Sequence, residues 1–261
     1  MKQAIGAPNP RSRRRDRIAL ATWSSPASAR ITAHLRLDVE DLTTALPGIA
    51  PVAAVGWSIA QGLERFPNVN RRVAVHRVRA NDSVRVSYAV SVSHDLQVAI
   101  IDAADKLTPN ATQRALLRES RAAQSGNGPF AKATRLMSAF PVVVSRPTLR
   151  IWSLLTAGLG VPLLGFGAAP FGAALVSSVA TFDLNAVEAP FVPFARCALV
   201  VSIGAARCEA SVRDGLVEPR DVIDLVVTAD HRICDGAQFA SFTHCVLGLL
   251  GQSQTGPPRR G

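Results

Sequence analysis

Alternation of apolar and polar side chains marks the first regular segment of the chain, residues 31–39 (ITAHLRLDV). Every second residue there is apolar, which predicts a strand with one buried face. Residues 55–66 instead place apolar side chains three and four positions apart, the spacing of an amphipathic helix. We expect this helix to end before Pro67, because proline cannot extend a helix and disfavours the helical conformation of the preceding residue.

The same patterns predict further strands and helices along the chain. The expected elements are a strand pair at 84–92 and 96–101, a helix over 111–124 with Asn110 as its N-cap, a strand at 223–229, and a helix from Gly236 onward. The last strand is rich in branched apolar residues, and the last helix follows it after a short corner. The corner is therefore held between two regular elements.

This corner, residues 230–237 (DHRICDGA), is the most informative segment of the sequence. It places His231 four residues before Asp235. Histidine is the side chain that most readily takes up and returns a proton near neutral pH. His231 is held by rigid elements and can face a cleft, so it is a candidate general base. On spacing alone, a histidine that only bonds a neighbouring backbone group fits equally well.

The corner resembles the catalytic domain of the dihydrolipoyl acyltransferases of 2-oxoacid dehydrogenase complexes, which carry a DHR-x-x-DGA run near the C-terminus. That family belongs to the chloramphenicol acetyltransferase superfamily. Residues 66–70 (FPNVN) and 102–106 (DAADK) are also similar to family segments, and the resemblance covers roughly residues 11–251. It implies a chloramphenicol acetyltransferase-like α/β fold, in which a mixed sheet and flanking helices form two layers.

A second site position follows from the resemblance. Residues 172–179 (GAALVSSV) are similar to the family's G-T-F-T-x-S-x-x strand, which implies that Ser177 donates its hydroxyl to an oxyanion. Ser178 is the alternative if the register shifts by one, and an ordinary strand serine is the other explanation. Residues 180–182 (ATF) stand where the family has Gly-x-x-Gly, so we expect the loop at the oxyanion to differ.

The resemblance implies acyl transfer between coenzyme A and a thiol or another acceptor. His231 would take the thiol proton, and Ser177 would stabilise the tetrahedral oxyanion. Asp235 is expected to hold the loop through an arginine, either Arg232 or one in the N-terminal segment. In the family the site forms between subunits of a trimer, so a homotrimer, or a larger assembly of trimers, is expected.

Two other functions remain open. The chain could be a non-catalytic assembly or binding module of an acyltransferase-type complex, which the altered loop after Ser177 favours. It could also be a biosynthetic enzyme on the same scaffold, in which His231 acts on a substrate that is not a thiol. No lipoyl domain is recognisable, so we expect no lipoyl group on this chain and a lipoyl or acyl-carrier protein acting in trans.

Composition and charge narrow the picture further. The 261 residues, 48% of them hydrophobic, can form one domain with a sizeable core. We expect this domain over residues 18–251, with a flexible basic arm at 1–17 and a flexible tail at 252–261. The formal net charge is +10, and 26 of the 29 basic residues are arginine. No nucleic-acid-binding module is recognisable, so packing of the arm on a neighbouring subunit, or attraction of coenzyme A phosphates, fits better.

The cysteine pattern bears on metal binding and on the cellular compartment. The four cysteines show no CxxC spacing, so a metal site is not expected. The N-terminus is basic but has no apolar core segment of a signal peptide. Reduced thiols and a cytoplasmic location are therefore expected.

Residues 151–182 contain no charged side chain and are numerous enough to span a bilayer. Seven glycines and prolines interrupt this segment, and it leads directly into the strand that carries Ser177. A membrane span is therefore not expected. We expect residues 148–157 to form a buried or surface-docked helix, followed by a loop. This helix could line an acyl pocket, or contact a partner or a membrane surface.

Overall fold

A computed structural model describes residues 29–75, 77–92, 95–125, 142–161, 169–213 and 215–252. The predicted basic arm at 1–17, most of the predicted tail at 252–261, and the turn residues Ser93 and His94 lie outside these ranges.

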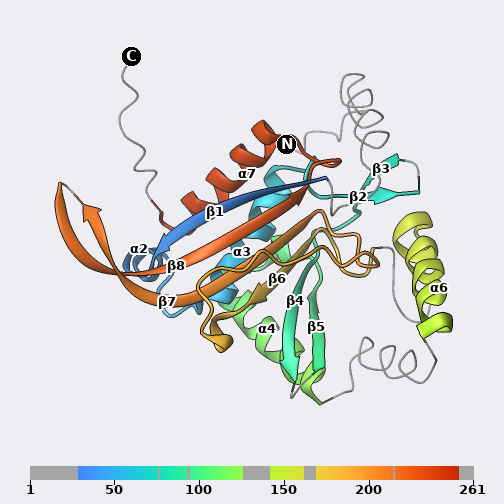
Figure 1. Cartoon of the computed structure of the whole chain (residues 1–261), viewed down its shortest axis with the longest axis horizontal. Helices are drawn as coiled ribbons and strands as arrows, with labels where there is room; N and C mark the ends of the chain where they lie inside the picture. The colour runs from blue at the N-terminus through green and yellow to red at the C-terminus, as the bar shows by residue number, and fades with distance from the viewer. Residues whose placement is uncertain are drawn as a thin grey trace.

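Six strands form one mixed sheet. They are β1 (Arg30–Asp38), β4 (Val86–Val92), β5 (Asp95–Ile101), β6 (Ala174–Ser178), β7 (Leu199–Arg213) and β8 (Leu216–Asp230). Their order across the sheet is β1-β8-β7-β6-β4-β5. β6 runs parallel to β4 and β7, whereas the other neighbours are antiparallel. A separate two-stranded sheet pairs β2 (Arg71–Ala74) with β3 (Arg77–Ala80) (Figure 1).

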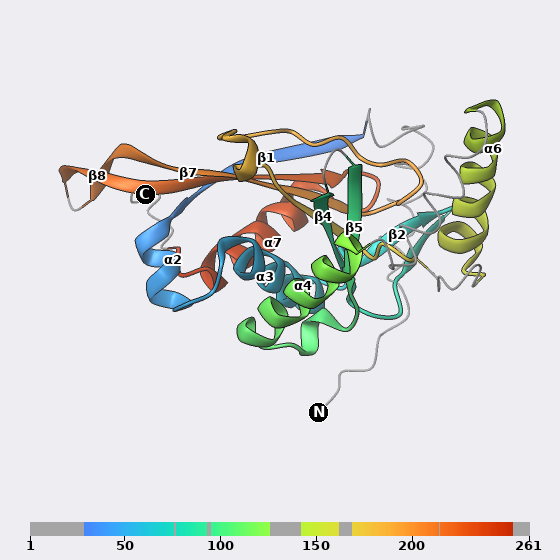
Figure 2. The ribbon, with the colours of Figure 1, turned by 90° about the horizontal axis from the view of Figure 1, so that it is seen from below.

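Helices cover one face of the large sheet. The α-helices are α2 (Val39–Ala45), α3 (Pro51–Arg65), α4 (Pro109–Gln124), α6 (Val142–Ser153) and α7 (Gly236–Leu249). Figure 2 shows α3, α4 and α7 together beneath the sheet, so the architecture has two layers. The predicted fold class, a two-layer α/β arrangement of a mixed sheet with flanking helices, is confirmed.

The main hydrophobic core lies between the sheet and these helices. α3 is buried along most of its length because it lies across the middle of this layer. The ring of Tyr88 on β4 approaches Gly56 of α3 so closely that a Cβ there would lie 1.9 Å from the tyrosine oxygen. Only glycine fits where α3 crosses β4. The packing therefore requires glycine at this position, although glycine lowers the stability of a helix.

The opposite face of the sheet is partly covered by residues 179–198. A smaller apolar cluster lies on this side, formed by Phe171, Ala195 and Cys197, with Trp152 packed against it. The covering segment lies close to β7, since a Cβ on Gly204 would lie 1.7 Å from the carbonyl oxygen of Asn185. This outer face therefore carries its own packed segment.

The predicted starts of two helices were wrong. The N-cap of α4 is Thr108 and not Asn110, because Pro109 occupies the first turn and the hydroxyl of Thr108 accepts a hydrogen bond from the amide of Ala111. The predicted helix at 148–157 instead begins at Val142 in α6, and a π-helical turn, η2 (Leu154–Leu159), follows it.

The last strand is also longer than predicted, and β7 was not predicted. β7 and β8 continue beyond the edge of β1 as a two-stranded ribbon (Figure 1). Where β1 still pairs with β8, Arg207 of β7 forms an ion pair with Asp224 of β8 at 2.6 Å. Asp224, which lies within the predicted strand, is therefore a cross-strand partner.

Candidate active site

The junction of β8 and α7 builds the corner that carries His231. β8 ends at Asp230, and α7 begins at Gly236. The side chain of Asp235 accepts a hydrogen bond from the amide of Gln238 at 2.9 Å, and the side chain of Gln238 accepts one from the amide of Asp235 at 3.2 Å. This reciprocal capping box fixes where the helix starts. Asp235 thus shapes the corner through the backbone of α7.

The imidazole of His231 is half-buried and has a defined orientation. Its Nδ1 lies 2.8 Å from the carbonyl oxygen of Cys234. A carbonyl oxygen can only accept a hydrogen bond, so Nδ1 is the donor and carries a proton. In the neutral ring the lone pair is then on Nε2. The backbone amide of His231 also donates to the carbonyl of Ala29 at 2.6 Å, which ties the corner to the start of β1.

An arginine from the small sheet braces the corner. Arg71 begins β2 and donates from Nη2 to the carbonyl oxygen of Ile233 at 2.7 Å. Its Nε donates to the carbonyl of Asn68 at 2.6 Å. The guanidinium therefore links the turn that ends α3 to the corner that holds His231. The sequence carries no signal for this role, because an arginine next to a loop is usually exposed.

A buried ion pair lies directly beside His231. Arg232 donates to both carboxylate oxygens of Asp230, from Nε at 3.0 and 3.2 Å and from Nη2 at 2.7 Å. The side chain of Asp230 is 2% exposed and that of Arg232 is 10% exposed. The predicted pairing of Arg232 with Asp235 is therefore wrong, because the guanidinium of Arg232 binds the carboxylate of Asp230 instead. The N-terminal arginines, the other predicted partners of Asp235, lie outside the described residues.

A second guanidinium adds positive charge near this pair. Arg196 donates from Nε to the hydroxyl of Ser153 at 2.9 Å and from Nη1 to the carbonyl of Val73 at 3.0 Å. Burial, and then the nearby charge of Arg232, lower the pKa of Arg196 below its ordinary value. The surroundings of the corner are thus positively charged, which suits an anionic group bound nearby.

Ser177 lies in the middle of the sheet, away from the corner. It stands on β6 between Ala89 of β4 and Ser202 of β7. Ser202 faces Val226 on β8, five residues before His231, which is about 16 Å along the strand, with two strand spacings of about 5 Å still to cross. The structure therefore does not bring Ser177 and His231 together within one chain.

The two candidate serines face opposite sides of the sheet. Leu175 belongs to the outer cluster and Val176 to the main core, so alternation along β6 places Ser177 on the outer face and Ser178 on the helix side. After them, residues 180–182 form a 3-10 turn that ends at Asp183 with a φ of 56°. A non-glycine residue thus adopts the left-handed conformation in the loop where the sequence departs from the family pattern.

The family of the chain follows from comparison with known proteins. The family model of the 2-oxoacid dehydrogenases acyltransferase (catalytic domain) matches residues 16–131 and 172–255, more than half of the sequence. The chain belongs to this acyltransferase family. A comparison with curated protein sequences finds no significant match.

Solved structures of this acyltransferase class share the fold. A probable dihydrolipoamide acetyltransferase from Listeria monocytogenes is 15% identical, with a TM-score of 0.64, over 98% of this chain and 97% of the other. The dihydrolipoamide acetyltransferase of Azotobacter vinelandii is 16% identical, with a TM-score of 0.59, over 96% and 92%. A chloramphenicol acetyltransferase is 12% identical, with a TM-score of 0.54, over 96% and 100%.

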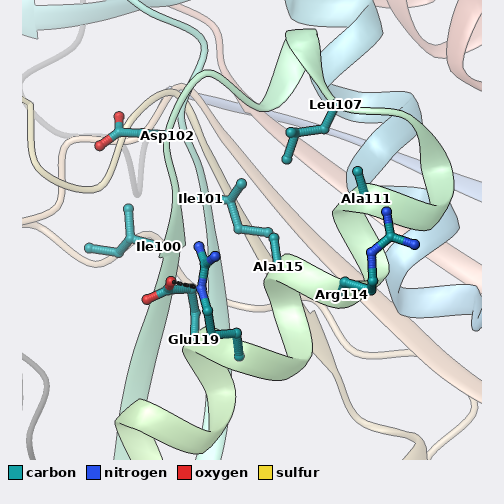
Figure 3. A pocket seen from close by; sticks show the side chains of 9 residues that line it. Ile100, Ile101, Asp102, Leu107, Ala111, Arg114, Ala115 and Glu119 are labelled. Atoms are coloured by element: carbon teal, nitrogen blue, oxygen red, sulfur yellow. Dashed lines mark hydrogen bonds and ion pairs between the residues drawn. The ribbon is translucent and has the colours of Figure 1, made fainter.

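Within this acyltransferase domain, a large cavity lies away from the corner. It measures about 680 Å³ and opens between β5 and α4. Figure 3 shows its apolar wall, with Ile101 and Leu107, and its charged rim, with Arg114 and Glu119. Three strands separate β5 from β8, so this cavity does not serve His231.

Two of the four cysteines, Cys197 and Cys234, are buried. Cys234, inside the corner, is 1% exposed and belongs to the main core, as expected for a small buried hydrophobe. Burial raises the pKa of the Cys197 thiol to about 12, which keeps it protonated and unreactive. Among the described residues, no cluster of three or more His, Cys, Asp or Glu side chains has the arrangement of a metal site.

Proposed function

We propose that this chain transfers an acyl group between coenzyme A and a thiol acceptor, with His231 as the general base. The observation that carries the proposal is the hydrogen bond from Nδ1 of His231 to the carbonyl of Cys234. It fixes the tautomer with the lone pair on Nε2, which a base needs before the substrate arrives. The match to the acyltransferase family supplies the reaction class.

The proposed chemistry moves one proton and one acyl group. Nε2 of His231 takes the proton of the attacking thiol, and the sulfur forms a bond to the thioester carbonyl carbon. Negative charge then develops on the carbonyl oxygen, where the hydroxyl of Ser177 donates a hydrogen bond. When the tetrahedral intermediate collapses, the original carbon–sulfur bond breaks. The departing thiolate takes its proton back from the imidazolium of His231.

We propose that the two groups meet between copies of the chain, in a homotrimer. The separation of Ser177 from His231 within one chain supports this proposal, because a shared site then requires two chains. Ser177 also faces the outer side of the sheet, which the helices do not cover. In the Azotobacter vinelandii enzyme, a serine, a histidine and an asparagine four residues after the histidine have been studied for their role in catalysis. His231 and Asp235 have that spacing here.

Ser177→Ala is expected to lower kcat about 10²–10³-fold, the usual effect of losing one oxyanion donor. The assay supplies acetyl-CoA and dihydrolipoamide to the purified full chain and follows the release of free coenzyme A by chromatography. Longer acyl-CoA thioesters serve as further donors, because the acyl group is not specified by the site. The KM for acetyl-CoA should change little, since the hydroxyl contacts charge that develops only in the transition state.

Ser178→Ala is the matched control, because it removes the same hydroxyl from the opposite face of the same strand. It should retain activity near that of the unaltered chain. Equal losses for both variants would contradict the assignment of Ser177. A chain that transfers no acyl group from any of these thioesters would overturn the proposed function and favour a non-catalytic assembly module.

Mixing two inactive variants tests the shared site. We expect His231→Gln and Ser177→Ala chains, coexpressed with different affinity tags and purified through both, to regain activity that neither has alone. A site is intact where the histidine of one variant meets the serine of the other, which happens at about one in three sites of the mixed cyclic trimers that both tags retain. Sedimentation velocity reports the oligomer. Mixed oligomers without recovered activity would rule out a site that needs both chains.

A further inference from the structure

α6 and η2, with the two residues that follow them (residues 142–161), pack through one face against other described parts of the domain. Ser153, Thr156 and Ala157 are buried, and Nε of Arg72 on β2 donates to the carbonyl of Ala157 at 2.8 Å. The ring of Trp152 meets that of Phe171 edge to face, with centroids 6.2 Å apart. Figure 2 shows α6 at the edge of the molecule, beyond β2. Its remaining surface faces away from the core.

That outward surface is apolar. Ile151 is 57% exposed, Leu159 49% and Val161 44%. Val75, at the end of β2, is 41% exposed and adjoins them, because a Cβ on Gly158 would lie 3.6 Å from its Cγ2 atom. We call these four side chains the apolar patch. Single exposed apolar residues are ordinary, but a contiguous group at one end of a domain marks an interaction surface.

The two chain segments that carry the apolar patch are rich in arginine, and Asp82, just beyond β3, is an acidic residue whose charge acts on Arg72. The sequence has no aspartate or glutamate at 71–80, and none from 120 to 182. The arginines of the two segments that form the patch are Arg71, Arg72, Arg77, Arg79, Arg146 and Arg150. The side chains of Arg77 and Arg150 are exposed. A surface that pairs apolar side chains with an excess of arginines is complementary to an anionic, amphipathic partner.

Three residues of the apolar patch, Ile151, Leu159 and Val161, lie outside the part of the chain that the family model matches. The family match leaves out residues 132–171, which include all of α6 and η2. No described helix is long and apolar enough to cross a bilayer, so a membrane contact here would lie along the surface.

We propose that the apolar patch docks on an anionic lipid bilayer, with α6 lying in the plane of the interface. Ile151, Leu159 and Val161 enter the boundary between headgroups and acyl chains, and Arg77 and Arg150 contact lipid phosphates. A lipid surface fits better than a protein groove, because a protein partner would need acidic side chains matched to each arginine. The lipid phosphates of an anionic bilayer can contact every arginine, because their positions are not fixed. This binding is independent of acyl transfer.

Flotation of the full chain with vesicles tests the proposal. The chain is expected to float with phosphatidylcholine vesicles that contain phosphatidylglycerol, and much less with phosphatidylcholine alone. The double variant Ile151→Glu/Leu159→Glu should bind the anionic vesicles about 100-fold more weakly, because it exchanges buried apolar area for charges that the surface repels. Arg150→Glu should weaken binding by roughly tenfold, and Arg150→Lys should preserve it.

The matched control places the same charges on exposed apolar residues elsewhere. Val212→Glu/Val217→Glu alters the β7–β8 ribbon, whose side chains at these positions are each 72% exposed, and should leave flotation unchanged. Circular dichroism verifies that each variant is folded. Binding that is equal with and without phosphatidylglycerol, or that survives Ile151→Glu/Leu159→Glu, would overturn the proposal. An oligomer that dissociates in that double variant, without any flotation of the unaltered chain, would instead assign the patch to a second copy.

Discussion

His231→Gln is expected to lower kcat for acyl transfer by about 10²–10⁴-fold, the usual contribution of a general base. Glutamine is close in size and keeps an amide that can donate to the carbonyl of Cys234. It cannot take up the thiol proton, so the variant isolates proton transfer from the shape of the corner. The measurement is the rate of coenzyme A release from acetyl-CoA with dihydrolipoamide as acceptor, at saturating concentrations of both.

His244→Gln is the control for this prediction, because His244 is exposed on α7. It should leave kcat unchanged. The thermal unfolding midpoint of His231→Gln should stay near that of the unaltered chain, since the substitution buries no charge. Full activity in His231→Gln would reject the proposed mechanism, even if the chain still transferred acyl groups.

Asp230→Ala is expected to lower the free energy of unfolding by about 3–5 kcal/mol, the cost of leaving one charge of a buried pair without its partner. Asp230 accepts hydrogen bonds from both the side chain and the backbone amide of Arg232. Its removal leaves the guanidinium in a site that is almost closed to water. Chemical denaturation, followed by circular dichroism, measures the change in free energy.

Two further variants distinguish the cost of the unpaired buried charge from the cost of removing a side chain. Asp230→Ala/Arg232→Met removes both charges and should regain much of the stability, because no unpaired ion remains buried. Glu119→Ala breaks the exposed pair with Arg118 and should cost less than about 1 kcal/mol. If Asp230→Ala were no more destabilising than Glu119→Ala, the corner would not depend on its ion pair.

The sequence predicted the fold class and the strand-to-helix corner because both depend on local patterns. Apolar spacing located β1, α3 and α7 closely, and Pro67 marked the end of α3 correctly. The corner residues themselves suggested the family, which the family match then confirmed. In each of these cases the evidence lay within a short window of the chain.

Other features depend on contacts between distant segments. β7 is largely buried in its first half and carries charged residues in the ribbon, so it has no single periodicity over its length. The brace from Arg71 to Ile233 joins residues 162 positions apart. The sequence also could not show that Arg232 pairs with Asp230 rather than with Asp235, because both aspartates stand close to Arg232 in the sequence. Such choices are decided by three-dimensional proximity, which spacing does not encode.

The π-helical turn η2 determines how the side chains of Ile151 and Leu159 are oriented relative to each other around the helix axis. In a straight α-helix, residues eight positions apart differ by about 80° in direction, because 3.6 residues make one turn. The wider turn from Leu154 to Leu159 rotates the chain less with each residue. This brings the two side chains closer to a common direction. The shared direction of these side chains therefore depends on how many residues make up the turn. Deleting one residue from η2 would rotate Leu159 away from the direction of Ile151.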